Sequence, residues 1–179
     1  MVMFALWVLV ALGVSGQDPM PSRTAASVQT LPTFAALATA NRQTELTVRW
    51  VVTAAAADTL VAPGSLPEVN RFEIVRRAAT VEAPVRERNP QIGPDELVVV
   101  AVDAQGRDVG WQRVKDPRTV RSEQPGRGGL LSGQTFHRSE TELVIRVPDG
   151  AAVAAVRVYE ARWNGREWLL RGLGTISLF

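Results

Sequence analysis

The sequence predicts an all-β fold, an antiparallel β-sandwich of about eight strands. Three observations predict it. Short runs of alternating apolar and polar residues recur along the chain. Turn residues separate these runs at intervals of about 8–12 residues. No long run has the apolar spacing of a helix, so packed strands are expected throughout.

Composition is typical of one globular domain. The chain has 179 residues, of which 46% are hydrophobic. Its 20 basic and 18 acidic residues nearly cancel, which argues against a nucleic-acid partner. The chain has no cysteine, which excludes disulfides, thiol catalysis and thiolate metal sites. Lys115 is the only lysine, and this arginine bias is typical of a GC-rich bacterial genome.

Residues 1–16 have the pattern of a secretory signal peptide, an apolar run followed by small residues. Cleavage fits after either Ser15 or Gly16. The run lacks the usual basic residues at its start, so an uncleaved anchor or a misassigned start is the alternative. A transmembrane helix would need about 20 apolar residues. We therefore expect a secreted or periplasmic (extracytoplasmic) protein, in contact with the membrane only through this export segment.

Residues 17–44 predict a flexible tether, because Pro, Ser, Thr and Ala dominate and few side chains are large. Within it, residues 33–38 could form one or two helical turns with Thr33 as the N-cap. Residues 45–179 then make up a single β-sandwich domain.

The first strand is expected at residues 45–53, with Leu46, Val48 and Trp50 on its apolar face. Residues 70–79 fit a strand, with a helix as the alternative because their apolar residues also fit helical spacing.

A hairpin is expected over residues 96–114, where Asp103 and Gly106 mark a type I turn with a glycine bulge. Residues 119–123 fit a short edge strand. Residues 124–134, which include the segment from Gly126 to Gly133, predict a glycine-rich loop that is either functional or disordered.

The clearest hairpin surrounds Asn164-Gly165, the pair preferred by a two-residue type I′ turn. Such a turn pairs Trp163 with Arg166 and Ala161 with Trp168. Further strands are expected at residues 141–147 and 174–179. At the level of the fold alone, this layout resembles an immunoglobulin-like or fibronectin-III-like β-sandwich.

The same pairing places a set of aromatic and apolar residues on one face of the hairpin. Trp163, beside the turn, should be partly exposed and could stack on Arg166. Core packing is the alternative for the residues farther from the turn. The candidate ligand-binding residues are Tyr159, Trp163, Arg166 and Trp168, with Leu170 on the same face.

Other chemistry finds little support in the sequence. His137 is the only histidine, and a hydrolytic triad would need it beside Ser132 or Ser139 and beside Glu140 or Glu142. Three aspartates near turns could supply oxygens to calcium, but they lack the acids of a calcium loop. They are Asp103, Asp108 and Asp116. We therefore expect no catalytic residues, no metal and no cofactor.

These observations lead to one expected function and two alternatives. The first is a secreted, non-catalytic bacterial module that binds a protein partner or serves an accessory role in the envelope. A carbohydrate-binding module using the aromatic face, with a glycan partner, is the second. A small hydrolase built around His137 is the third.

Overall fold

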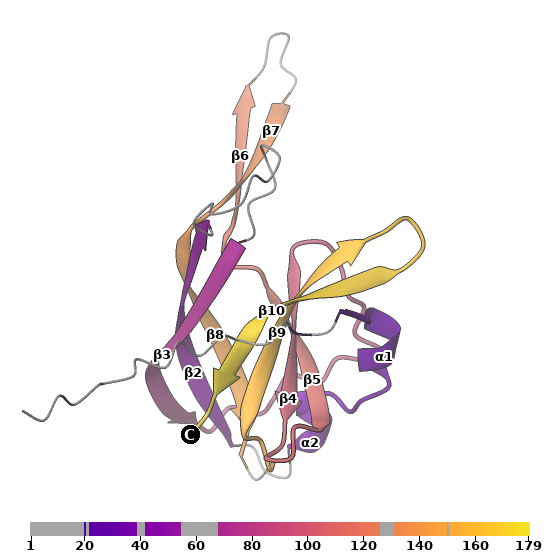
Figure 1. The fold of residues 1–179 in the computed structure, drawn as a ribbon, viewed down its shortest axis with the longest axis vertical. Coiled ribbons are helices and arrows are strands. Elements are labelled where there is room, and N and C mark those ends of the chain that lie inside the picture. Colours follow the sequence, from indigo (N-terminus) through magenta and orange to yellow (C-terminus); the bar gives the residue numbers. More distant parts are fainter. Residues whose placement is uncertain (1–19, 21, 39–41, 55–67, 126–130, 150) are drawn as a thin grey trace, which may run out of the picture.

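The structure is a computed structural model that describes residues 20, 22–38, 42–54, 68–125, 131–149 and 151–179. The expected signal peptide at residues 1–16 lies outside these residues. No helix in this part of the chain is long and apolar enough to cross a membrane. The fold is all-β and its strands pair antiparallel, as the sequence predicts (Figure 1).

The strands form two sheets and a separate hairpin. The five-stranded sheet has the order β1-β10-β9-β4-β5, and the three-stranded sheet has the order β3-β2-β8, while β6 pairs with β7. The bounds are β1 Arg23–Thr24, α1 Ala25–Gln29, α2 Phe34–Leu37, β2 Gln43–Ala54, β3 Glu68–Thr80, β4 Glu96–Val102, β5 Asp108–Lys115, β6 Thr119–Pro125, β7 Leu131–His137, β8 Glu140–Pro148, β9 Ala155–Trp163 and β10 Trp168–Ser177.

One core cluster contains side chains from both sheets. Trp50 of β2 and Ile145 of β8 belong to it, together with Val99 of β4 and Val158 of β9. Trp50 also stacks on Phe72 of β3, with ring centroids 5.3 Å apart. Residues 70–79 are therefore strand, and the helical alternative is wrong.

The other face of the five-stranded sheet carries a second buried cluster. Val98 and Val100 of β4 belong to it, while Val99, between them, faces the first core. A strand that is buried on both faces reads as a continuous apolar run, as β4 does. Ala25 and Val28 of α1 cover this second cluster.

The predicted tether is wrong for residues 22–38. This segment forms β1, α1 and α2, and it places Val28 and Phe34 in the two clusters. Thr33 does cap α2, because its side chain accepts a hydrogen bond from the backbone N–H of Ala36. Gln43 and Thr44 belong to β2. Small side chains such as Ala25 and Val28 are enough to cover the second cluster, because α1 lies close against the sheet.

The turn between β4 and β5 is the predicted one. The backbone N–H of Gly106 donates to the Asp103 carbonyl, and Gly106 has a φ of 79°. The ladder shifts register between Ala101 and Val102, as a glycine bulge requires.

The turn between β9 and β10 differs from the prediction. Trp163 pairs with Trp168, so residues 164–167 form the connection and the two-residue type I′ turn is wrong. Such a turn needs positive φ at both central positions, and among the described non-glycine residues only Asn89 and Asp95 have one. The Asn164 side chain instead accepts hydrogen bonds from the backbone N–H groups of Arg166 and Glu167.

Two further strand predictions need correction. The expected separate strand at residues 174–179 is the end of β10, which continues past a bulge between Gly172 and Gly174. The glycine-rich stretch 124–134 is not all loop, since its two ends belong to β6 and β7. Residues 126–130 lie outside the described residues.

Candidate functional site

The end of the β9–β10 hairpin extends beyond the rest of its sheet. The pairing of β4 with β9 stops at Leu97 and Glu160, and β1 reaches only Leu169 and Leu170 of β10. Residues 161–168 therefore form a two-stranded projection, which we call the tryptophan tip (Figure 1).

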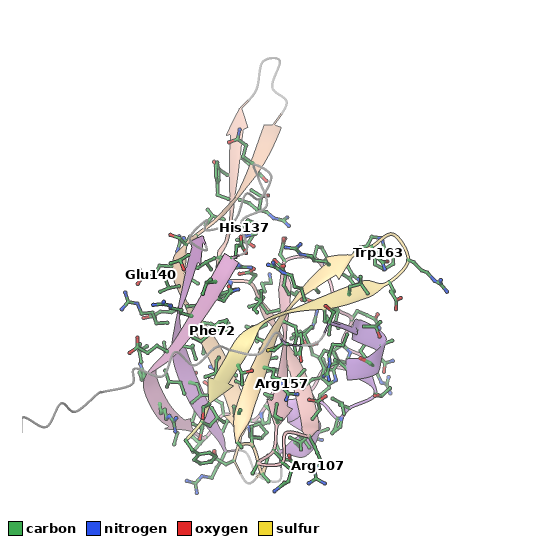
Figure 2. The ribbon with its side chains drawn as sticks, in the orientation of Figure 1. Phe72, Arg107, His137, Glu140, Arg157 and Trp163 are labelled. Carbon is green, nitrogen blue, oxygen red and sulfur yellow. The ribbon has the colours of Figure 1, made fainter. Side chains whose placement is uncertain are left out.

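Two tryptophans face each other across the tip. Trp163 and Trp168 are directly opposite, and their ring centroids lie 5.5 Å apart at an interplanar angle of 59°. Asn164 donates its backbone N–H to Glu167, which makes the next pair inward a non-hydrogen-bonded one, where side chains approach most closely. Trp163 is 55% exposed, whereas Trp168 packs partly against the second cluster. Figure 2 shows Trp163 at the far end of the hairpin.

The predicted site residues do not all come together. Tyr159, Trp163 and Trp168 share one face of the hairpin, as predicted, but Tyr159 is fully buried. Arg166 is exposed in the turn. Among the described residues, the cation–π pairs join Arg118 to Trp50 and Arg23 to Tyr159, so the predicted Arg166–Trp163 stack is not formed.

Tyr159 lies beside a cluster of charges. The guanidinium of Arg23 is 5.4 Å from its ring centroid, and Asp108 accepts from both Arg23 at 2.6 Å and Arg157 at 3.1 Å. The Tyr159 hydroxyl is buried and has no hydrogen-bond partner among the described residues. Burial raises the pKa of Tyr159 above its ordinary 10.0, and the positive charges of Arg23 and Arg157 partly oppose the increase.

We expect alkaline pH to destabilise the fold through Tyr159. Because its pKa is higher in the folded state, the folded protein keeps the phenolic proton at a pH where the unfolded chain has lost it. Stability should therefore fall as pH rises above about 10. Tyr159 is the only tyrosine, so phenolate absorbance reports it alone. The loss of stability at alkaline pH that comes from Tyr159 should be absent in Tyr159→Phe. An equal loss in the variant and in the wild type would contradict the assignment of this effect to Tyr159.

An ion-pair network holds the base of the tip. The Glu160 carboxylate accepts from Arg162 at 2.8 Å, from Arg171 at 3.1 Å and from Arg118 at 3.4 Å. Arg171 also reaches Glu68 of β3 at 3.3 Å. The network joins β9 and β10 just below the tip to each other and to β3 of the other sheet, and Arg162 is its one member within the tip.

The hydrolase alternative depends on His137 and Glu140, and the structure places the first at the surface and the second in an ion pair. His137 is exposed at the end of β7, and Glu140 is ion-paired with Arg49 at 2.7 Å (Figure 2). The side chain of Ser132 lies outside the described residues.

The three calcium candidates are each paired with arginine. Asp108 binds the two arginines named above, and Asp116 binds Arg118. Asp103 receives the backbone N–H groups of Arg107 and Gln105, and the bond from Arg107 contributes most to lowering its pKa. In the part of the chain that the structure describes, no group of three or more acids and histidines could hold a metal ion.

Comparison with known proteins finds no match: no family model, no curated protein and no solved structure is significantly similar to this chain.

Proposed function

We propose that this chain is a secreted bacterial, non-catalytic β-sandwich module that binds a protein partner through the tryptophan tip. The observation that carries the proposal is the exposure of Trp163. Its ring packs on Trp168, yet 55% of the residue faces solvent at the end of a projection. A partner with an apolar pocket would bury it.

The geometry of the tip suits protein recognition. Tryptophan contributes large contact area with few rotatable bonds, and it is enriched among the residues that dominate binding energy. The contact with the cross-strand partner Trp168 restricts the Trp163 ring before binding, which reduces the entropy lost on association. The exposed Arg166 adds a positive charge in the turn that follows Trp163.

A carbohydrate ligand is the second candidate, because one exposed indole face can stack on a sugar ring. The interplanar angle of 59° weighs against a flat platform, since the two rings cannot lie along the same sugar chain. A protein partner needs only the single protruding ring. The small hydrolase has the least support, because Glu140 is engaged by Arg49.

The finer fold class is also a proposal. Two antiparallel sheets that contribute to one core support a β-sandwich. The immunoglobulin-like or fibronectin-III-like assignment rests on the strand pattern of the sequence. Export rests on the apolar residues 1–16.

The test places a photo-crosslinking amino acid at position 163 of the full chain in its native host. We expect a specific protein adduct that is absent when the same group replaces Val144, an exposed residue of β8. Purified partner should bind wild type and the matched variant Leu169→Ala, and should lose at least tenfold in affinity to Trp163→Ala. Leu169→Ala should keep wild-type stability within about 0.5 kcal/mol. Trp163→Ala, which loses its contact with Trp168, should stay folded and lose about 0.5–1.5 kcal/mol.

Two outcomes contradict the proposal. One is equal partner affinity for Trp163→Ala and wild type. The other is a glycan array on which the wild type binds sugars and Trp163→Ala does not, with no protein adduct in the host; that result would support the carbohydrate alternative.

A further inference from the structure

The β6–β7 hairpin stands apart from both sheets. Within the described residues, β6 and β7 pair only with each other, from Thr119↔His137 to Pro125↔Leu131 (Figure 1). The side chains of Arg121, Glu123 and Phe136 are exposed. A two-stranded hairpin is at best marginally stable alone in water, so additional strand partners would stabilise this one. We call it the arm.

The register of the β6–β7 ladder shows which backbone groups of the arm have no partner among the described residues. At its base, the backbone N–H of Arg138 donates to the carbonyl of Arg118 at 3.0 Å. Hydrogen-bonded and non-hydrogen-bonded pairs alternate along an antiparallel ladder. Val120 and Ser122 therefore direct their N–H and C=O groups towards β7. Arg121 and Glu123 direct theirs away from it, along the edge of β6 that pairs with no other described strand.

We propose that a second copy of this chain pairs with that edge, β6 against β6, antiparallel about a two-fold axis at Ser122. The axis places Arg121 opposite Glu123 of the second copy, and Glu123 opposite its Arg121. These residues have the outward backbone groups, so each pair exchanges both main-chain hydrogen bonds. Two arms then form one four-stranded ribbon.

Charge complementarity is the reason for choosing a second copy as the partner. Directly opposite residues share a face of the sheet, and opposite charges there attract while like charges repel. Edge strands that avoid association commonly carry charged side chains, especially lysine, and two copies of one edge repel each other when opposite positions carry charges of the same sign. Here the residues on either side of Ser122 have opposite signs, so the edge complements itself under a two-fold axis. The edge of β7, where Gly133 and Thr135 face outward, has no such pairing.

Cysteine cross-linking tests the register directly. The chain has no cysteine, so Ser122→Cys introduces a single thiol. At a non-hydrogen-bonded pair the two Cα atoms lie about 4.5 Å apart, within the range of a disulfide. Mild oxidation of the full chain should therefore yield a covalent dimer, while Thr135→Cys, on the β7 edge, should remain monomeric. Equal cross-linking of the two variants, or none, would overturn the proposal.

Charge reversal tests the same pairing without a covalent bond. Sedimentation equilibrium of the wild type should show a dimer that dissociates on dilution and on addition of salt. Arg121→Glu and Glu123→Arg should each weaken dimerisation about tenfold or more, because each creates like charges at both symmetric pairs. The double variant reverses both signs and should restore wild-type affinity within about threefold.

A control is needed because Arg121 also forms an ion pair with Asp95 of its own chain. Asp95→Asn removes that contact and should leave the dimer unchanged. A wild type that stays monomeric up to millimolar concentration would overturn the proposal, and so would a double variant that binds as weakly as the single ones. Every one of these variants leaves the tryptophan tip intact, so the proposed function is tested separately.

Discussion

Arg118→Ala is expected to lower the free energy of unfolding by about 3–5 kcal/mol. Arg118 is 4% exposed and its ion-pair partner Asp116 is 8% exposed. The guanidinium donates to Asp116 Oδ2 at 2.7 Å and lies 4.0 Å from the Trp50 ring centroid. Removing it leaves a buried carboxylate without its cation and uncovers one face of the Trp50 ring.

Urea unfolding of matched variants separates the charge effect from packing. Arg118→Leu should be nearly as harmful as Arg118→Ala, because Asp116 remains charged and unpaired. Combining Arg118→Leu with Asp116→Leu should recover much of the loss, since replacing a whole buried ion pair by apolar residues is often close to neutral. A single variant that loses less than about 1 kcal/mol would contradict the assigned role of the pair.

Phe34→Ala is the second large effect, expected at about 3–5 kcal/mol. Phe34 is 3% exposed and belongs to the core cluster shared by the two sheets. The same substitution at Phe179, which is 96% exposed, is the matched control and should cost less than about 0.5 kcal/mol. Thermal or urea unfolding measures both.

The Phe34 result also tests the role of the N-terminal segment. If residues 22–38 were a tether, Phe34→Ala would behave like Phe179→Ala. A large difference between the two variants is what the buried position predicts, and equal stabilities would contradict it.

Local turn chemistry was the most reliable guide to the fold. Asp103 and Gly106 fix the β4–β5 turn through contacts within a few residues, so the sequence contains all that is needed to predict it. Thr33 caps α2 in the same local way.

The β9–β10 hairpin shows where such rules reach their limit. The Asn164 side chain closes a longer turn, so the true register is displaced by two residues from the predicted one. A shift of two preserves the inward and outward faces, because side chains alternate with a period of two. The shared face of Tyr159, Trp163 and Trp168 was therefore predicted correctly from an incorrect register.

Composition led to wrong predictions for segments whose structure depends on tertiary packing or strand pairing. Residues 22–38 contain few large side chains, yet Ala25 and Val28 are buried because a small helix can lie close to a sheet. The glycines after residue 124 suggested a loop, although the ladder of the arm continues to Pro125 and resumes at Leu131.

The candidate site was predicted only in part. The exposure of Trp163 follows from its place beside a turn, which the sequence shows. The Glu160 network cannot be predicted from the sequence in this way, because it joins residues from β9, β10, β3 and the segment before β6. Contacts between such distant residues have no periodic signal in a single sequence.

The order of strands in the sheets has a consequence for when the chain can fold. β1 pairs with β10, and β2 pairs with β8, so each sheet joins an early segment of the chain to a late one. Neither sheet can be completed while the ribosome is still making the last third of the protein. Nascent chains should therefore leave both sheets incomplete and accessible to chaperones until synthesis is nearly finished.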